Sequence, residues 1–502
     1  MFSLDNRRDN CIFAGKLSNM ASPTLKEKTA RGLLWGGLSN GVQQALNLLF
    51  GIFLARMLTP AEYGMVAVLA IFSLIAVALQ ESGFTSALVN RKGFRHEDYN
   101  AVFWFNILMS GGMYAILFLC APLIAHFYET PELTALARYS FLGFVFSSWG
   151  TAQHAYLYKH LMVKQRSIAT ISAHILSGCI GLWMVYNGYS YWGLATQNLS
   201  YIFFVTLIYW ALSPWRPTLH IDFAPLKEMI GFSWKMLVTK IFNHINTQVM
   251  TIILGKFYTK TETGNYSQAY KWSSMGGLFI VGMSGSVAQP VLAQVAQDKE
   301  RQKQVFKKML NFVSFISFPL MLGLGLVAHE LILITIKEQW LPCVPMMQLL
   351  CISGAFVPIT DLHRHLLVSR KRADVYLWNS VVSGILVLLA CLVVSPLGIM
   401  TMIVVYVCIN IAWLAVWQYF VWKEIGLSII HSFKEIVPFA LIAAASMAVT
   451  WWITEGVENI YYCIVAKMVV AAVSYIALSW IFKAEMLKEC VGYLLHKKVT
   501  NA

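Results

Sequence analysis

The chain has 502 residues, of which 58% are hydrophobic and 12% are charged, and its formal net charge is +14. Soluble domains average about 25% charged residues, so this chain has too few charges to cover a surface that faces water. Composition therefore excludes a series of soluble domains and favours one polytopic helical bundle in a bilayer, in keeping with a mean hydropathy of +0.61.

The first 30 residues are polar and basic, and they lack an apolar stretch long enough for a signal peptide. Fourteen runs of roughly 20 mostly apolar residues follow, which is the length that a transmembrane helix needs. The runs near Val145, His244 and Leu350 are the most polar, as helices that line a water-filled space are. The approximate centres of the fourteen runs are Val42, Ile75, Tyr114, Val145, Gly178, Phe203, His244, Phe279, Leu320, Leu350, Leu386, Tyr406, Ala444 and Val470.

Basic residues divide unevenly between the two sides of these fourteen spans. With the N-terminus in the cytoplasm, 29 of the 38 Lys and Arg fall in cytoplasmic segments, including all four between 364 and 372. The opposite side keeps only Arg56, Lys256, Lys260 and Lys337. Because Lys and Arg in short loops set orientation, we expect a multi-pass membrane protein with both termini in the cytoplasm. Charges spread over so many segments suit anionic lipid head groups and argue against nucleic acid as a partner.

One pattern occurs twice, 200 positions apart. "ARMLTPAEYG" closes the first span, and "GKFYTKTETG" closes the seventh, so that Thr59, Glu62 and Gly64 recur as Thr259, Glu262 and Gly264. Here Thr-Pro is expected to end a helix, and Gly64 to ease the chain back into the bilayer. Since six spans separate the copies, the two units have the same orientation and predict parallel six-helix lobes around a central cavity.

The repeat also predicts domain boundaries. We expect an N-terminal tail over 1–30, an N-lobe over 31–213, a linker over 214–230 and a C-lobe over 231–422. Two appended helices over 423–482 and a cytoplasmic tail over 483–502 complete the chain.

Four stretches carry a family resemblance that covers about Lys26 to Phe420. They are "FLARMLTPAEYGMVAV", "ESGFTSALVNRK", "APLIAHFYETPELTALAR" and "KEQWLPCVPMMQLLCISGAFVPI". With them the chain resembles the Wzx-type lipopolysaccharide and capsule flippases, in the polysaccharide-exporter branch of the multidrug/oligosaccharidyl-lipid/polysaccharide superfamily. The resemblance implies two six-helix lobes and transport of an undecaprenyl-pyrophosphate-linked oligosaccharide between leaflets. The polymerase and glycosyltransferases of the same pathway are the further partners that it suggests.

Polar side chains in spans one and seven are the candidate substrate-binding residues. Asn40, Gln44 and Asn47 follow helical i, i+4, i+7 spacing in span one, and their amides are suited to sugar hydroxyls. They are equally suited to hydrogen bonds between helices.

In span seven, Lys240 and His244 share a face with Asn243 beside them, whereas Lys235 lies about 140° around the helix from Lys240. This group suits a pyrophosphate or an acidic sugar. Alternatively, Lys235 extends to the interface and His244 packs between helices.

Other ionisable residues in the spans have plainer interpretations. Glu81 ends span two and is a candidate for proton or ion coupling, with a helix-end acid near the head groups as the alternative. Arg138 and Lys271 are expected to extend to the outer interface. His174 is expected to be structural, and Lys467 to lie in the appended helices away from the cavity.

Catalytic and cofactor motifs do not occur, so we expect no enzyme activity, no metal and no cofactor. The sequence therefore predicts a secondary transporter. A multidrug or cation antiporter of the same superfamily is the main alternative, but lysines outnumber acids in the spans, which favours anions. A polysaccharide polymerase would need a sizeable outer loop, and a scaffold would not need polar helix faces.

Overall fold

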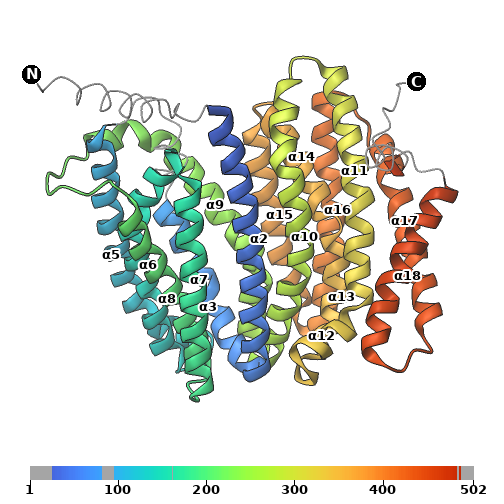
Figure 1. The fold of residues 1–502 in the computed structure, drawn as a ribbon, viewed down its shortest axis with the longest axis horizontal. Helices are drawn as coiled ribbons and strands as arrows, with labels where there is room; N and C mark the ends of the chain where they lie inside the picture. Colours follow the sequence, from blue (N-terminus) through green and yellow to red (C-terminus); the bar gives the residue numbers. More distant parts are fainter. Residues whose placement is uncertain (1–24, 82–94, 161, 483–485, 488–502) are drawn as a thin grey trace, which may run out of the picture.

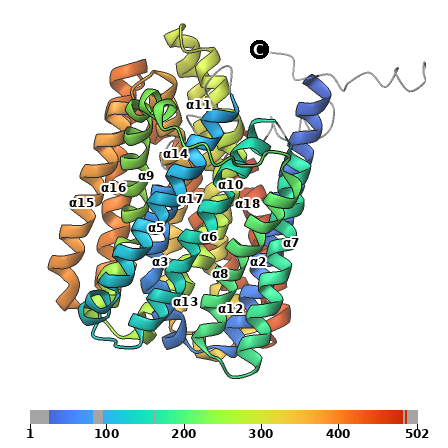
Figure 2. The ribbon, with the colours of Figure 1, turned by 90° about the vertical axis from the view of Figure 1, so that its left-hand side faces the viewer.

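The computed structural model describes residues 25–81, 95–160, 162–482 and 486–487. Within helices, the side chains of 25–38, 75–81 and 227–240 and of a few single positions are outside the description. Every regular element among the described residues is a helix, and the long helices run side by side between two faces (Figure 1; Figure 2). The predicted fold class, an all-helical polytopic bundle, is confirmed.

Six long helices form the N-lobe, on the left in Figure 1. In this lobe α5 packs against α6, α7 against α8, and α2 against α7. The helices are α2 (Leu25–Met57), α3 (Pro60–Glu81), α5 (His96–Phe127), α6 (Leu133–Lys159), α7 (Val163–Tyr186) and α8 (Tyr191–Leu212).

The C-lobe repeats this arrangement with one helix broken in two. Its helices are α9 (Ala224–Phe257), α10 (Lys260–Gln294), α11 (Lys299–Leu326), the short α12 (Ala328–Ile336), α13 (Cys343–Gly354), α14 (Val357–Ser369), α15 (Ala373–Val394) and α16 (Ile399–Ile425). Together, α13 and α14 fill one membrane length. The appended α17 (Ile429–Thr454) packs on α11, and α18 (Ile460–Ile481) packs on α17 and α12, at the right of Figure 1.

Each of the fourteen predicted centres falls on one of these helices. Of the described segments, eight are long and apolar enough to cross a membrane by length and composition, so the count of fourteen stays a prediction. Figure 1 places the start of α2 and the end of α18 on the same face, which we call the terminal face. The opposite face carries the α2–α3 and α9–α10 turns and is called the turn face.

The repeated Thr-x-x-Glu is a helix cap in both copies. At the start of α3, Glu62 Oε2 accepts from the Thr59 backbone N at 2.6 Å, and Thr59 Oγ1 accepts from the Glu62 N at 3.4 Å. At the start of α10, the same bonds join Thr259 and Glu262, at 3.0 and 3.2 Å. Such a capping box satisfies backbone donors that the first turn of a helix leaves free, which explains why both residues recur.

The repeated glycine has a different purpose from the one predicted. A Cβ added to Gly64 would lie 2.0 Å from the carbonyl oxygen of Lys260, and one added to Gly264 would lie 1.8 Å from that of Pro60. Both distances are far below contact, so α3 and α10 approach closely across the lobe boundary only because both positions are glycine. Since neither glycine has a positive φ, the expectation that Gly64 serves chain conformation was wrong. The repeat marks the contact between the lobes.

Candidate functional site

A polar cavity of about 560 Å³ lies inside the C-lobe, between α9, α10, α13, α14, α15 and α16. Hydroxyls, amides and aromatic rings make up much of its wall, a combination that suits the hydroxyls and ring faces of sugars. The polar and aromatic lining residues are Asn243, Asn246, Thr247, Tyr270, Ser273, Ser274, Ser353, Arg364, Tyr376, Ser380, Ser383, Tyr406, Asn410 and Trp417.

Two asparagines of α9 hold this wall in place. Asn243 Nδ2 donates to the Tyr376 hydroxyl at 3.2 Å, and Asn246 Nδ2 donates to the Ser380 carbonyl at 2.7 Å. These bonds fix α9 against α15 along the cavity. The predicted residue Asn243 therefore lies in a cavity, and its neighbour Asn246 shares that position.

Arg364 gives the cavity a positive charge. Its guanidinium carbon lies 5.4 Å from the ring centre of Trp417 and 5.9 Å from that of Tyr376. Its Nε is buried and has no hydrogen-bond partner, and no carboxylate among the described residues pairs with the group. An arginine held between aromatic faces without a counter-charge is suited to bind an anion.

The sequence analysis assigned Arg364 to a cytoplasmic loop, which was wrong. The helix that began before Leu350 is broken between Gly354 and Val357, and α14 then continues to Ser369. Arg364 thus lies inside the bundle, and the loop begins only at Arg370. Pro358, in the first turn of α14, was the available local signal for this break.

A second polar cavity of about 170 Å³ lies in the N-lobe. The predicted residue Asn47 lines it, together with Lys271, which reaches in from α10 of the C-lobe. Lys271 lies eleven residues, or about 16 Å, beyond Lys260 at the turn face. That depth prevents it from extending to the interface as expected. His174, expected to be structural, lines the same cavity and stacks on Tyr201 with ring centres 4.2 Å apart.

The remaining predicted residues are not brought together by the described structure. Asn40 and Gln44 are exposed on α2, two turns and one turn from Asn47 toward the terminal face. His244 is half-buried on α9, where its carbonyl accepts from Thr247 Oγ1. The side chains of Lys235, Lys240 and Glu81 lie outside the described residues.

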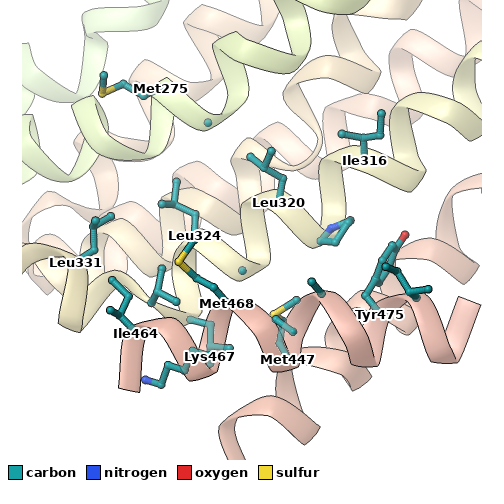
Figure 3. Close-up of a pocket in the computed structure, with 18 of the residues that line it drawn as sticks. Met275, Ile316, Leu320, Leu324, Leu331, Met447, Ile464, Lys467, Met468 and Tyr475 are labelled. Carbon is teal, nitrogen blue, oxygen red and sulfur yellow. The ribbon is translucent and has the colours of Figure 1, made fainter. Parts of the chain in front are cut away.

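A third cavity, of about 810 Å³, separates the C-lobe from the appended helices. Leucine, isoleucine and methionine side chains of α11, α17 and α18 dominate its wall, as Figure 3 shows. Lys467 lines it as well, and its Nζ lies 2.6 Å from Glu330 Oε1 of α12. The appended helices therefore border an apolar space, and Lys467, which was expected in these helices and away from the central cavity, lines this separate one.

Polar contacts hold the two lobes together at the turn face. Arg56 of the N-lobe donates to the Thr335 and Ile334 carbonyls of α12, at 2.6 and 2.7 Å. Lys256 of the C-lobe lies 2.9 Å from Glu129, between α5 and α6. We call these contacts the turn-face latch. Because Arg56 and Lys256 are repeat equivalents, the latch follows the internal symmetry.

Glu129 also shows how the latch responds to charge. The hydrogen bond and charge of Lys256 hold the pKa of Glu129 below its ordinary value. Glu129 has a positive φ of 53°, and Lys337, which follows α12, has a φ of 75°. Both residues are in the left-handed region, which residues other than glycine rarely adopt, and both follow a helix that ends near the latch contacts.

The chain is similar to known proteins both in sequence and in fold. Residues 53–345 match the family model described as "Polysaccharide biosynthesis protein". The chain is 25% identical over 358 residues to the lipopolysaccharide biosynthesis protein WzxC of Escherichia coli K12, covering 70% of this chain and 72% of that protein. It is also 25% identical over 360 residues to the succinoglycan biosynthesis transport protein ExoT of Rhizobium meliloti, with 71% and 73% covered.

Among solved structures, the lipid II flippase MurJ in an inward closed conformation superposes with a TM-score of 0.76. The superposition covers 90% of this chain and all of that one, at 13% sequence identity. At this identity the similarity establishes the fold alone.

Proposed function

Because the chain belongs to the polysaccharide biosynthesis protein family, we propose that it moves a lipid-linked oligosaccharide across a membrane by alternating access. The substrate is the undecaprenyl-pyrophosphate-linked unit that the family resemblance implies. The protein binds and releases this unit without making or breaking its bonds. It acts in a bacterial inner membrane, beside the glycosyltransferases and polymerase that supply and consume the unit.

The C-lobe cavity is the observation that carries this proposal. Its hydroxyls and amides match sugar hydroxyls, its aromatic rings match sugar faces, and Arg364 matches an anionic group. A lipid-linked glycan also needs room for a hydrocarbon chain. The apolar cavity beside α18 supports that requirement, since its volume and lining suit a prenyl segment.

The closed turn face supports a direction of transport. With the latch formed, the lobes are joined at the face that carries the repeated turns. The terminal face, which the distribution of basic residues assigns to the cytoplasm, is then the side from which the substrate enters. Breaking the latch exposes the substrate to the opposite side.

A cation or multidrug antiporter is the alternative within the superfamily. Its substrates are best held by carboxylates, because a buried cation needs a negative partner. The described lining of the C-lobe cavity has an arginine and no Asp or Glu. Charge therefore favours the anionic, sugar-bearing substrate.

Deletion of the gene in the encoding bacterium tests this function. We expect lipid-linked oligosaccharides to accumulate in the cytoplasmic leaflet, where an impermeant lectin cannot reach them until spheroplasts are lysed. Expression of the full chain should restore their exposure. Normal surface polysaccharide in the deletion strain, with related transporters also removed, would contradict the proposal.

A further inference from the structure

Lys271 crosses the lobe boundary at membrane depth. It belongs to α10 of the C-lobe, yet the cavity that it enters is otherwise lined by α2, α3, α7 and α8 of the N-lobe. The side chain thus occupies a cavity of the opposite lobe. Any movement that separates the two lobes here withdraws Lys271 from that cavity.

The position of the amine depends on a glycine in α2. A Cβ added to Gly51 would lie 2.5 Å from Lys271 Nζ, and nothing else is closer than the neighbouring Cε. Gly51 therefore leaves the space that the amine fills. A side chain at residue 51 would displace it.

The cavity is polar but contains no counter-charge for Lys271. Polar side chains without a carboxylate surround the amine: Asn47 and Tyr63 from α2 and α3, His174 and Ser177 from α7, and Gln197, Asn198 and Tyr201 from α8. The lining of the cavity has no Asp or Glu, and among the described residues Lys271 Nζ forms neither an ion pair nor a hydrogen bond. His174, Tyr63 and Tyr201 are the other titratable groups that face it. Asn47 and Asn198, two of the residues that line the cavity, are exposed.

We propose that Lys271 is the group that couples transport to protons. An ammonium without a counter-ion is costly in a cavity enclosed by the two lobes, but it is well hydrated once the lobes part. Closure at the turn face therefore favours the neutral amine, and opening favours the ammonium. Lysine is suited to this exchange because burial readily changes its protonation.

This inference rests on the proposed transport cycle and adds the coupling ion to it. In the open state, Lys271 takes one proton from the side of the turn face and becomes an ammonium. When the lobes close again after the substrate has left, the same proton is released toward the terminal face. One proton thus moves against each exported substrate, with no other charge or bond change at Lys271.

The distance between the lobes at the turn face tests the coupling without any substrate. Spin labels are placed on the full chain by Tyr189→Cys and Leu397→Cys, which are exposed in the α7–α8 and α15–α16 turns, after native cysteines are replaced. Pulsed electron resonance then measures the distance in nanodiscs from about pH 5 to about pH 10, a range that includes the ordinary pKa of His and ends just below that of Lys, about 10.4. We expect the open-to-closed ratio to rise as the pH falls, by up to about tenfold per pH unit for one proton.

Variants assign the proton to one residue. Lys271→Met and Lys271→Gln should remain closed across the pH range, while His174→Gln should keep the pH response of the unmodified chain. If both Lys271 variants open with the same pH dependence as the parent, the inference is wrong. If the pH response is as expected but the protein does not transport a lipid-linked glycan, the proposed function fails and the coupling role of Lys271 stands.

Discussion

Charged side chains inside the bundle are the residues whose replacement has the clearest expected effect. Lys467 and Glu330 are both buried and form one ion pair between α18 and α12. Lys467→Met leaves the Glu330 carboxylate without its partner and should destabilise the protein by about 3–5 kcal/mol. The double variant with Glu330→Gln should recover much of that loss. Thermal unfolding in detergent measures both, and equal stability of the single variant and the parent would contradict the account.

Arg364 should affect transport more than stability. Arg364→Gln removes the positive charge from the C-lobe cavity and should lower transport of an anionic lipid-linked glycan at least about tenfold, a rise of about 1.4 kcal/mol in the transport barrier. Arg364→Lys should transport at a rate between those of Arg364→Gln and the parent, because an ammonium lacks the planar group that stacks on Trp417. Lys423→Gln, which removes an exposed charge near the end of α16, is the control and should transport normally.

Helical spacing in the sequence identified polar faces on spans one and seven, but not which of their residues line a cavity. Asn47 and Asn243 were named as polar residues on spans one and seven, and both line cavities. Lys271 was misjudged, because a position along one helix says nothing about a cavity in the other lobe. Arg364 was assigned to a loop because hydropathy does not show that a broken helix continues.

At the scale of elements, the turn-face latch joins turns and helix ends that are far apart in the chain. Lys256→Ala removes the ion pair with Glu129 and should raise the population open at the turn face several-fold, as measured with the spin-label pair described above. Lys303→Ala, which removes an exposed pair within α11, is the matched control. An unchanged distance distribution in Lys256→Ala would show that this contact does not hold the lobes together.

The latch also predicts a dependence on pH. The pKa of Glu129 is lowered when it is paired with Lys256, so the pair favours closure above the ordinary Glu value of about 4.3. The contribution of the Lys256–Glu129 pair to closure is lost as the pH falls through the lowered pKa of Glu129. The effect is therefore confined to strongly acidic pH, below the range in which Lys271 is expected to act. Lys256→Ala should abolish the acidic component alone.

The close contact of α3 with α10 predicts that neither of its two glycines can be replaced by a larger residue without separating the helices. Gly64→Ala and Gly264→Ala each place a methyl group against a backbone carbonyl of the opposite lobe and should prevent full closure. Gly112→Ala, on α5 where no atom lies within 4 Å of an added Cβ, should behave as the parent. Cross-linking between the lobes at the turn face measures closure, and efficient cross-linking in Gly64→Ala would contradict this role.

Elements were predicted well where an apolar run was long and uninterrupted. The division into α12, α13 and α14 was not predicted. The run from Leu341 to Ile359 stays largely apolar across the break at Ala355 and Phe356, so hydropathy does not reveal the break. Hydrophobic patterning reports which residues avoid water. It does not report where a helix changes direction to pack on its neighbours.

At the scale of the whole molecule, the internal repeat predicts two parallel lobes, and the structure has them. The equivalents Thr59 and Thr259 cap α3 and α10 at the same face, and Gly64 and Gly264 meet across the lobe boundary. What the repeat could not predict is the closed state at that face. Closure depends on pairs such as Arg56 with Thr335, and although the repeat relates Arg56 to Lys256, it does not identify the distant residue that each one contacts.

Transport by the purified chain in proteoliposomes is the most direct test of the central claim. A fluorescent lipid-linked oligosaccharide is placed in both leaflets, and an impermeant reductant quenches the pool that it can reach. We predict that the full chain makes the inner-leaflet pool accessible, and that Arg364→Gln slows this at equal protein content. If liposomes with the parent chain retain the protected pool as protein-free liposomes do, the chain is not a flippase for this substrate.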